Sequence, residues 1–309
     1  TLGNGYMCVR SCEDEYIPEQ SDRLMLIAGM YNLHEQETTW IQNAPDFTNT
    51  VFSADGEEVR PMPVSAGEHT DKYEQFCKCF DMRDGLLQRS FVYHTESGKT
   101  LSFHFERIVS LERMHVMAVR CTVKTDRDVQ LKIRSGIINT EPDCFVEKTA
   151  RSAQSSVGYT CVTDESGITF SLATDARCTL GTRELRRIGV SEEQDAIFED
   201  FSFTLSPDET LVFEKICAVH TSRDLENESL STEQIVAKTV AQAEGAPGFE
   251  TLYRESADAW KRLWQEKDII VDTDWEFERQ AIRYAIYNLT ITVPRHDARM
   301  NIGARGLQG

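Results

Sequence analysis

The residues whose types and spacing are best suited to bind a ligand lie in the final stretch, residues 295–309, which is rich in arginine and glycine. Arg299, Asn301 and Arg305 follow an apolar segment, and Gly303 lies among them. A guanidinium group donates paired hydrogen bonds to oxyanions, and glycine lets the backbone approach a ligand closely. This stretch could therefore bind a phosphate or a sugar. The alternative is a loop after a helix, whose arginines pair with acidic neighbours.

A second candidate is the segment around Trp40 and Phe47, which we expect to be a long loop and which also contains Glu35, Glu37 and Asp46. Aromatic rings pack on the C–H faces of sugars, and carboxylates accept hydrogen bonds from hydroxyls. A surface loop held by its own aromatic side chains fits the sequence equally well. A carboxylate pair for glycosidic chemistry is defined by separation in space, so none can be chosen among 51 acidic residues.

Metal binding is disfavoured by the spacing of cysteine and histidine. Cys77 and Cys79 would share one face of a strand, but a zinc site needs four ligands, and no second pair follows at ligand spacing. The seven histidines form no HxxxH or HExxH pattern, so we predict no metal site. The nine cysteines are scattered through apolar alternating segments, which is typical of reduced thiols rather than of a disulfide framework.

The composition narrows the classes of function. The chain of 309 residues carries 33 basic and 51 acidic side chains, a net charge of −18, which disfavours binding to nucleic acid. Hydrophobic residues make up 40%, enough for a sizeable core. The sequence shows no apolar run of membrane-spanning length and no opening signal segment, so we expect a cytoplasmic protein with no membrane contact.

The elements that must position these residues are mainly strands. From about residue 47 to 219 apolar and polar residues alternate, and Asp55-Gly56 is a strong two-residue hairpin signal. Residues 96–99 predict a second hairpin. The absence of alternating strands and helices argues against a parallel sheet and for a large antiparallel sandwich. Strands are predicted near Met7 and Val9, and over residues 47–53, 58–62, 86–93, 101–109, 116–123, 129–137, 158–162, 168–173, 198–205 and 211–218.

The periodicity changes to that of helices near residue 230. Residues 231–234 can cap a helix that ends at Gly245, and a second helix is predicted over 250–267. Residues 273–276 read as a capping box for a third helix, which Pro294 ends. We expect this helix to face inward with Phe277, Ala281, Ile282, Ala285, Ile286 and Leu289.

Three parts follow from this pattern. They are a β-domain over residues 1–229, a helical linker over 230–272, and the start of a helical domain over 273–309. Three helices after a complete β-domain are too few to close a core of their own. We therefore expect further helical sequence downstream.

Several stretches carry a resemblance to a known family. They are TLGNGYMCVR at residues 1–10, residues 27–32 with 45–49, residues 81–92 leading to 105–107, and residues 259–264 with 301–307. On these stretches the chain resembles the N-terminal part of glycoside hydrolase family 65, the group of maltose, trehalose, kojibiose and nigerose phosphorylases and some related α-glucosidases. It departs from the family where Cys8 replaces the usual glycine, Arg305 the usual lysine and Gln308 the usual threonine.

The resemblance implies a β-supersandwich, linker helices and the first helix of an (α/α)6 barrel. It implies inverting phosphorolysis of an α-linked disaccharide or glucoside to glucose 1-phosphate, with inorganic phosphate as co-substrate and no cofactor. A barrel glutamate acts as general acid in the family. That residue and the family's Phe-Trp-Asp sugar motif would lie beyond residue 309, so we assign no catalytic residue here and expect this chain alone to be inactive.

The same resemblance raises the expectation of a homodimer and of a missing C-terminal barrel. It places Asn301, Gly303 and Arg305 beside the substrate, together with Trp40 and Phe47. Two other functions stay open at this point. One is an α-glucoside hydrolase of the same family, in which a second carboxylate activates water. The other is a non-catalytic β-sandwich that binds carbohydrate.

Overall fold

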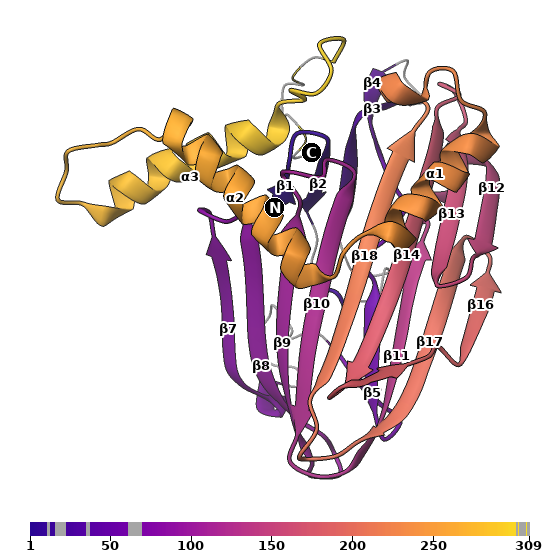
Figure 1. Cartoon of the computed structure of the whole chain (residues 1–309), viewed down its shortest axis with the longest axis vertical. Coiled ribbons are helices and arrows are strands. Elements are labelled where there is room, and N and C mark those ends of the chain that lie inside the picture. Colours follow the sequence, from indigo (N-terminus) through magenta and orange to yellow (C-terminus); the bar gives the residue numbers. More distant parts are fainter. Residues whose placement is uncertain are drawn as a thin grey trace.

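The computed structural model of the chain describes residues 1–10, 13–15, 23–34, 38–60, 70–300, 302 and 307. Within these residues the strands form antiparallel sheets, two of which face each other, and the helices lie outside this sandwich (Figure 1). No described helix is long and apolar enough to cross a membrane. The predicted class, mainly β with a large antiparallel sandwich followed by helices, is confirmed.

The large sheet forms the face of the sandwich that the helices cover (Figure 1). It runs in the order β12 (Phe145–Ser152), β13 (Ser156–Thr163), β14 (Thr169–Leu180), β18 (Leu211–Thr221), β10 (Val116–Thr125), β9 (Thr100–Val109), β8 (Leu86–His94) and β7 (Tyr73–Asp81), with β15 (Arg183–Leu185) paired to β14.

Strand β10 shows why the centre of this sheet reads as a continuous apolar run. Side chains alternate between the two faces of a strand, and here both faces are covered. Val116 and Ala118 pack with residues of helix α2 (Phe249–Lys267). Met117 and Val119 belong to the core between the sheets.

The second sheet runs in the order β16 (Gly189–Glu193), β17 (Ala196–Leu205), β11 (Val129–Ile138), β5 (Thr50–Ala54) and β6 (Glu57–Val59). Asp55 and Gly56 join β5 to β6 with φ of 52° and 90°, the positive values that a tight hairpin needs and that Asp-Gly tolerates. The predicted hairpin at residues 96–99 likewise joins β8 to β9. Both predicted hairpins are confirmed.

Aromatic side chains fill the space between these two sheets. Phe52 of the second sheet meets Phe103 and Phe213 of the large sheet edge to face, with ring centroids 5.5 and 6.3 Å apart. This geometry suits the quadrupole of the rings. The register of both sheets therefore directs alternate residues of each strand into one common core.

Charged groups are buried in the same interior. Lys215 donates from Nζ to the carbonyl oxygens of Asn49 and Gly136, both at 2.8 Å. Glu199 is fully buried, its carboxylate accepts no hydrogen bond from the described residues, and the closest cation is Arg187, with Nη1 3.6 Å from Oε2. Burial raises the pKa of Glu199 from 4.5 to about 8, although Lys215 and Arg187 act in the opposite direction.

A smaller end sheet closes one end of the sandwich, in the order β1 (Leu2–Gly3), β2 (Met7–Arg10), β3 (Leu24–His34) and β4 (Thr38–Asn43). The predicted strand around Met7 and Val9 is β2. The turn before it is fixed by Asn4, whose Oδ1 accepts from the backbone N–H groups of Tyr6 and Met7, both at 3.0 Å. The predicted long loop around Trp40 is wrong for residues 38–43, which pair as β4 with the edge of the apolar strand β3. Residues 44–49, which include Phe47, connect β4 to β5 as a loop.

Helix α1 (Thr232–Gly245) lies across β14 and β18 (Figure 1). Its predicted capping box is confirmed: Ser231 Oγ accepts from Gln234 N, and Gln234 Oε1 accepts from Ser231 N at 2.8 Å. Helix α2 then packs beside β10 and buries Trp260 against Gly85. A Cβ at Gly85 would lie 2.3 Å from Trp260 Nε1.

Helix α3 (Glu276–Thr292) begins later than the predicted capping box. Its N-cap is Trp275, with no side-chain cap, because Thr273 Oγ1 instead accepts from Trp275 N at 3.2 Å and donates to Glu278 Oε2 at 2.8 Å. The helix ends at Thr292, two residues before Pro294, as predicted.

The inward face predicted for α3 is also largely wrong. Phe277 is 77% exposed and Leu289 65% exposed, whereas Tyr287 and Ile291 are buried against Trp260 and the end sheet. Helical periodicity locates the apolar positions of a helix but not the neighbours that cover them. Of the other residues expected to face inward, Ala281 and Ala285 are exposed, and Ile282 and Ile286 are partly buried.

Candidate functional site

Three segments that are distant in sequence meet beside the end sheet, and we call this place the junction. It comprises residues 3–6, residues 222–228 after β18, and residues 293–300 after α3. Gly5 has φ of 87°, its N–H donates to Ile291 O at 3.0 Å, and an added Cβ would lie 2.3 Å from Val293 O. Glycine is therefore required by both conformation and space.

Arg299 lies in the junction with its guanidinium group fully engaged. Nε and Nη2 bind the Asp297 carboxylate at 3.0 and 2.6 Å, Nη1 pairs with Glu228, and Nη2 donates to Arg223 O at 2.8 Å. The hydrogen bonds that Arg299 donates to Asp297 lower the pKa of this carboxyl group to about 2. For Arg299, the alternative in which the arginine pairs with acidic neighbours describes the structure.

Asn301, Gly303 and Arg305 lie outside the described residues, so their proximity to a substrate stays a prediction. Two described neighbours, Met300 and Leu307, both lie beside β3. The Met300 side chain contacts Gly29 of β3, where a Cβ would lie 2.6 Å from Met300 Cε. Leu307 is buried in the cluster that also holds Leu26 of β3.

Trp40 and Phe47 do not share a surface. Trp40 lies in β4 opposite Asn32, and its side chain is 45% exposed. Phe47 is fully buried in the core with Met7. Asp46, beside it, forms a buried ion pair with Arg23. Of the two residues, only Trp40 presents a ring to solvent, and the substrate contacts of both stay predictions.

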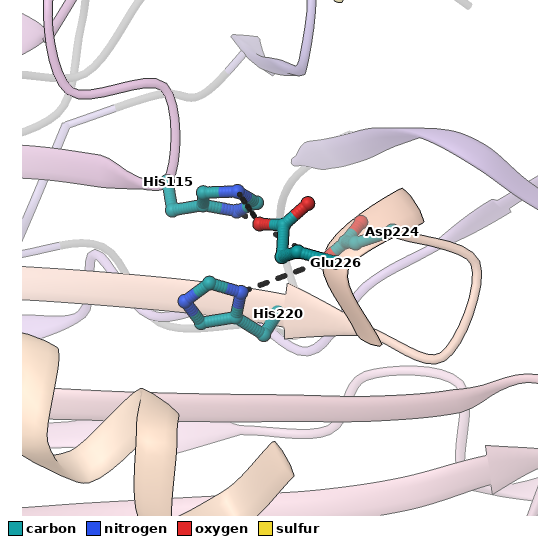
Figure 2. A group of neighbouring side chains, drawn as sticks. All are labelled: His115, His220, Asp224 and Glu226. Atoms are coloured by element: carbon teal, nitrogen blue, oxygen red, sulfur yellow. Dashed lines mark hydrogen bonds and ion pairs between the residues drawn. The ribbon is translucent and has the colours of Figure 1, made fainter. Parts of the chain in front are cut away.

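A group of histidine and carboxylate side chains lies beside the junction, and we call it the His–Asp–Glu cluster (His115, His220, Asp224 and Glu226) (Figure 2). The two imidazole rings stack with centroids 4.0 Å apart. Tyr6 packs edge to face on His115 at 4.3 Å. The first three residues of the cluster are buried, while Glu226 reaches the surface.

The electrostatics of this cluster follow from its burial. Burial, together with the charge of His220, lowers the pKa of His115 to about 4, so its ring is neutral near pH 7. Burial alone would raise the pKa of Asp224, but its contacts with His220, His115 and Thr221 leave that pKa below its usual value. Burial and the Asp224 carboxylate raise the pKa of Tyr6 well above its usual value.

Sequence reasoning missed this cluster, because we sought two histidines at helical spacing. Instead, His115 immediately precedes β10 and His220 lies in the neighbouring strand β18, where Val116 of β10 pairs with Ala218. The available signal was His220, Asp224 and Glu226 at short spacing after a predicted strand. The missing partner, His115, becomes a neighbour only through the strand register.

The cysteines gather into no comparable site among the described residues. Cys77 and Cys79 are both exposed on β7, which is the edge of the large sheet. None of the described cysteines is paired in a disulfide. Cys8, Cys121 and Cys217 are among the buried thiols, and burial raises the pKa of each.

Comparison with known proteins identifies the family. Residues 1–263 match the profile described as "Glycosyl hydrolase family 65, N-terminal domain". The sandwich, helix α1 and most of helix α2 are therefore those of a carbohydrate-active enzyme family. The chain belongs to glycosyl hydrolase family 65, and the resemblance drawn from its motifs is confirmed.

Its curated relatives include phosphorylases. The chain is similar to the kojibiose phosphorylases of Halothermothrix orenii (28% identity over 100% of this chain and 40% of the relative) and Escherichia coli (24%, 99% and 40%). It is also similar to the maltose phosphorylase of Bacillus subtilis, with 26% identity over 100% of this chain and 42% of the relative. The chain thus spans about two fifths of the length of these relatives.

The fold has a counterpart among solved structures. A protein from the human microbiome, provisionally described as a kojibiose phosphorylase, superposes with a TM-score of 0.87 over 100% of this chain and 41% of that chain. The sequence identity is 17%, so this likeness establishes the fold alone.

Proposed function

We propose that this chain is the N-terminal part of an inverting disaccharide phosphorylase that cleaves α-glucosides with inorganic phosphate and releases glucose 1-phosphate. The observation that carries the proposal is the family match over residues 1–263, together with similarity along the whole of this chain to part of proteins named as phosphorylases. The reaction belongs to the complete protein, because the chain spans about 40% of the first of these relatives.

The exposed surface of α3 supports a role within a longer protein. Phe277, Tyr284 and Leu289 on the helix, and Ile270 and Trp275 before it, are 55–89% exposed. Soluble proteins rarely leave so many large apolar side chains uncovered in one place. The helix and the loop before it project beyond the edge of the large sheet (Figure 1). We propose that the remaining helices of a barrel cover this face.

The proposed chemistry is a single displacement. A phosphate oxygen attacks the anomeric carbon from the face opposite the leaving group, and the bond to the glycosidic oxygen breaks. A glutamic acid on the barrel donates its proton to that oxygen. An α-glucoside thus gives β-glucose 1-phosphate. No described residue of this chain is assigned to these steps. In this proposal the sandwich supports the barrel and shapes the rim of its active site.

The experiment begins with the length of the native product, measured as intact mass from the source cells. The complete protein and residues 1–309 are then incubated with kojibiose, maltose, nigerose and trehalose, with and without phosphate. We expect the complete protein to release β-glucose 1-phosphate from one of them, with the anomer read by NMR, and the shorter chain to release none.

Two outcomes would replace this proposal. Release of free glucose that does not depend on phosphate would identify an α-glucoside hydrolase of the same family. Sugar binding by residues 1–309, without catalysis by any longer product and without binding of a dye that reports apolar surface, would identify a carbohydrate-binding sandwich. Release of glucose 1-phosphate by residues 1–309 alone would contradict the assignment of catalysis to the barrel.

A further inference from the structure

The His–Asp–Glu cluster has the composition and the spacing of a metal site. Its four residues each offer one ligand atom, and these atoms all lie within 4.8 Å of one another. His115 comes immediately before β10, His220 lies near the end of β18, and the two carboxylates lie in the turn that follows (Figure 2). Imidazole nitrogen and carboxylate oxygen are ligands that Zn²⁺ and related divalent ions accept.

The hydrogen bonds of His115 leave a lone pair directed at an anion. Its Nδ1 lies 2.9 Å from Val219 O, and a carbonyl oxygen can only accept, so Nδ1 carries the hydrogen. In a neutral imidazole the other nitrogen, Nε2, is then an acceptor. It lies 3.0 Å from Glu226 Oε1, which is also an acceptor. Such a pair needs a positive charge between or beside its atoms.

His220 repeats this arrangement at a deeper position. Its Nε2 lies 2.5 Å from Gln242 Oε1, and the amide oxygen accepts, so Nε2 carries the hydrogen. Nδ1 is left as an acceptor, 3.4 Å from Asp224 Oδ2. The residue is 1% exposed, and Nδ1 has no hydrogen-bond partner among the described residues. An unpartnered buried acceptor of this kind requires an explanation.

The groups behind the cluster are those expected around metal ligands. Each imidazole donates its second N–H to a protein oxygen, which fixes the ring and its tautomer. Asp224 is held by Tyr6 Oη at 3.1 Å, by Thr221 N at 2.8 Å and by Asn227 Nδ2 at 3.1 Å. These donors keep the carboxylate ionised and in place.

The cluster also has an opening and a competing cation. Glu226 is partly exposed, so an ion could enter past it. Lys238 Nζ lies 3.3 Å from Glu226 Oε1 and 2.7 Å from Asn227 Oδ1. It neutralises part of the charge of Glu226 at the rim, and within the described part of the chain it pairs with neither His220 nor Asp224. The buried half of the cluster therefore lacks a cation within the described residues.

We propose that His115, His220, Asp224 and Glu226 form a binding site for a divalent cation of the Zn²⁺ class. The ion would have a structural role, because the turn that carries Asp224 and Glu226 also bears Glu228, which pairs with Arg299. Tyr6 joins the same site through Asp224. Occupancy would thus fix the three segments of the junction together. This inference does not depend on the proposed function.

The test uses protein in which Cys77 and Cys79 are changed to serine, because exposed thiols could bind zinc on their own. The protein is stripped with a chelator and titrated with Zn²⁺ by calorimetry, with the bound metal counted by elemental analysis. Co²⁺ serves as a spectroscopic probe. We expect about one equivalent per chain, a raised melting temperature, and visible bands typical of nitrogen and oxygen ligands at low coordination number.

Variants separate a metal site from a structural cluster. His220→Ala should weaken binding at least 100-fold, and Gln242→Ala about 10-fold through loss of ring orientation. His104→Gln, a histidine on β9 outside the cluster, is the matched control and should leave the affinity unchanged. If His220→Ala fails to fold, Glu226→Gln at the partly exposed rim replaces it, with at least 10-fold weaker binding expected.

Two results would overturn the proposal. One is the absence of stoichiometric binding in the stripped protein, which would leave a proton shared between His115 and Glu226 as the explanation of the cluster. The other is unchanged affinity in both His220→Ala and Glu226→Gln, which would place any bound zinc elsewhere.

Discussion

Gly5 and Glu199 show how single residues of this chain are constrained by what surrounds them. At Gly5 the constraint is space, because the junction leaves no room for a Cβ. At Glu199 the constraint is solvation, because the carboxyl group is buried without hydrogen bonds from the described residues. Each constraint leads to a measurable prediction.

The first prediction concerns Gly5→Ala. A positive φ alone costs an alanine about 1 kcal/mol, and the approach of Val293 O to 2.3 Å adds steric strain. We expect the free energy of unfolding, measured by urea titration, to fall by about 2–4 kcal/mol. Gly98→Ala is the control, because Gly98 has φ of 76° but nothing within 4 Å of an added Cβ. Equal losses for the two variants would contradict the contact at the junction.

The second prediction concerns pH and Glu199. Because the pKa in the folded state, about 8, exceeds the ordinary value of 4.5, folding favours the protonated form. Burial of Glu199 therefore costs no stability below pH 4.5, and the free energy of unfolding falls as the pH rises from 4.5 towards 8. Glu199→Gln removes this loss, so we expect it to stabilise the protein by about 1–3 kcal/mol at pH 7.

The same variant should give no gain at pH 4, where the carboxyl group is protonated in the folded state. Glu184→Gln, at an exposed position of β15, controls for the loss of one negative charge. The comparison uses urea titrations at pH 4, 5.5 and 7. A gain that is independent of pH would show that burial of the Glu199 carboxylate is not its source.

At the scale of elements, the helices differ in how completely the chain covers them. Helix α1 is fixed by its capping box and by β14 and β18. Helix α3 contacts α2 and the end sheet along one side only. Its other side carries large apolar side chains in solvent. An element of this kind contributes little stability per apolar residue until something covers it.

The third prediction compares the two sides of α3. Ile291→Ala removes a fully buried side chain and should lower the free energy of unfolding by about 2–4 kcal/mol. Leu289→Ala, at a position that is 65% exposed, should change it by less than about 0.5 kcal/mol. The Leu289 variant should instead reduce binding of a dye specific for apolar surface. A large loss of stability from Leu289→Ala would show that this side is covered.

Elements whose signal is local were predictable from the sequence, and elements that depend on a distant partner were not. Asp55-Gly56 indicates its hairpin without any other part of the chain, and Ser231 indicates the start of α1 in the same way. Strand β7 was missed because residues 74–79 are exposed at a sheet edge and show no alternation of burial. The covered side of α3 was missed because Tyr287 is buried by Trp260 of α2 and by residues of the end sheet that are far away in sequence.

The residues of the candidate site likewise differ in whether local sequence or a distant partner determines their position. The junction arginine, Arg299, was identified from its local composition, and one of its two predicted interpretations describes its contacts. The His–Asp–Glu cluster was not predicted, because the position of His115 beside His220 depends on the register of β10 with β18. Such a register is set by all residues of both strands together.

At the scale of the whole molecule, the sandwich presents its end sheet towards the segment that leads to the proposed barrel. Trp40 is exposed on this sheet, and Met300 and Leu307, which flank the stretch 301–306, both pack against β3 of the same sheet. If the active site of the complete protein forms beyond this stretch, Trp40 is the aromatic residue of the sandwich that would line its rim.

The fourth prediction follows for the complete enzyme. Trp40→Ala should raise KM for the disaccharide about 3- to 10-fold, as expected for one lost aromatic contact, and should lower kcat less. Ile188→Ala, another exposed apolar residue that lies beside β16, is the control. Steady-state phosphorolysis rates for the three proteins provide the measurement. Unchanged kinetics in Trp40→Ala would remove this residue from the active site.

The contacts between helix α3 and the first residues of the chain affect how the protein folds during synthesis. Tyr287 Oη donates to Thr1 O across a separation of 286 residues, and Gly5 depends on the same late helix. At about 5–20 residues per second, a ribosome needs roughly 15–60 s to synthesise that interval. During this time β1 and β2 have no cover from α3. We expect this region to be the last part of the sandwich to become protected during synthesis, and the part in which chaperones have most time to act.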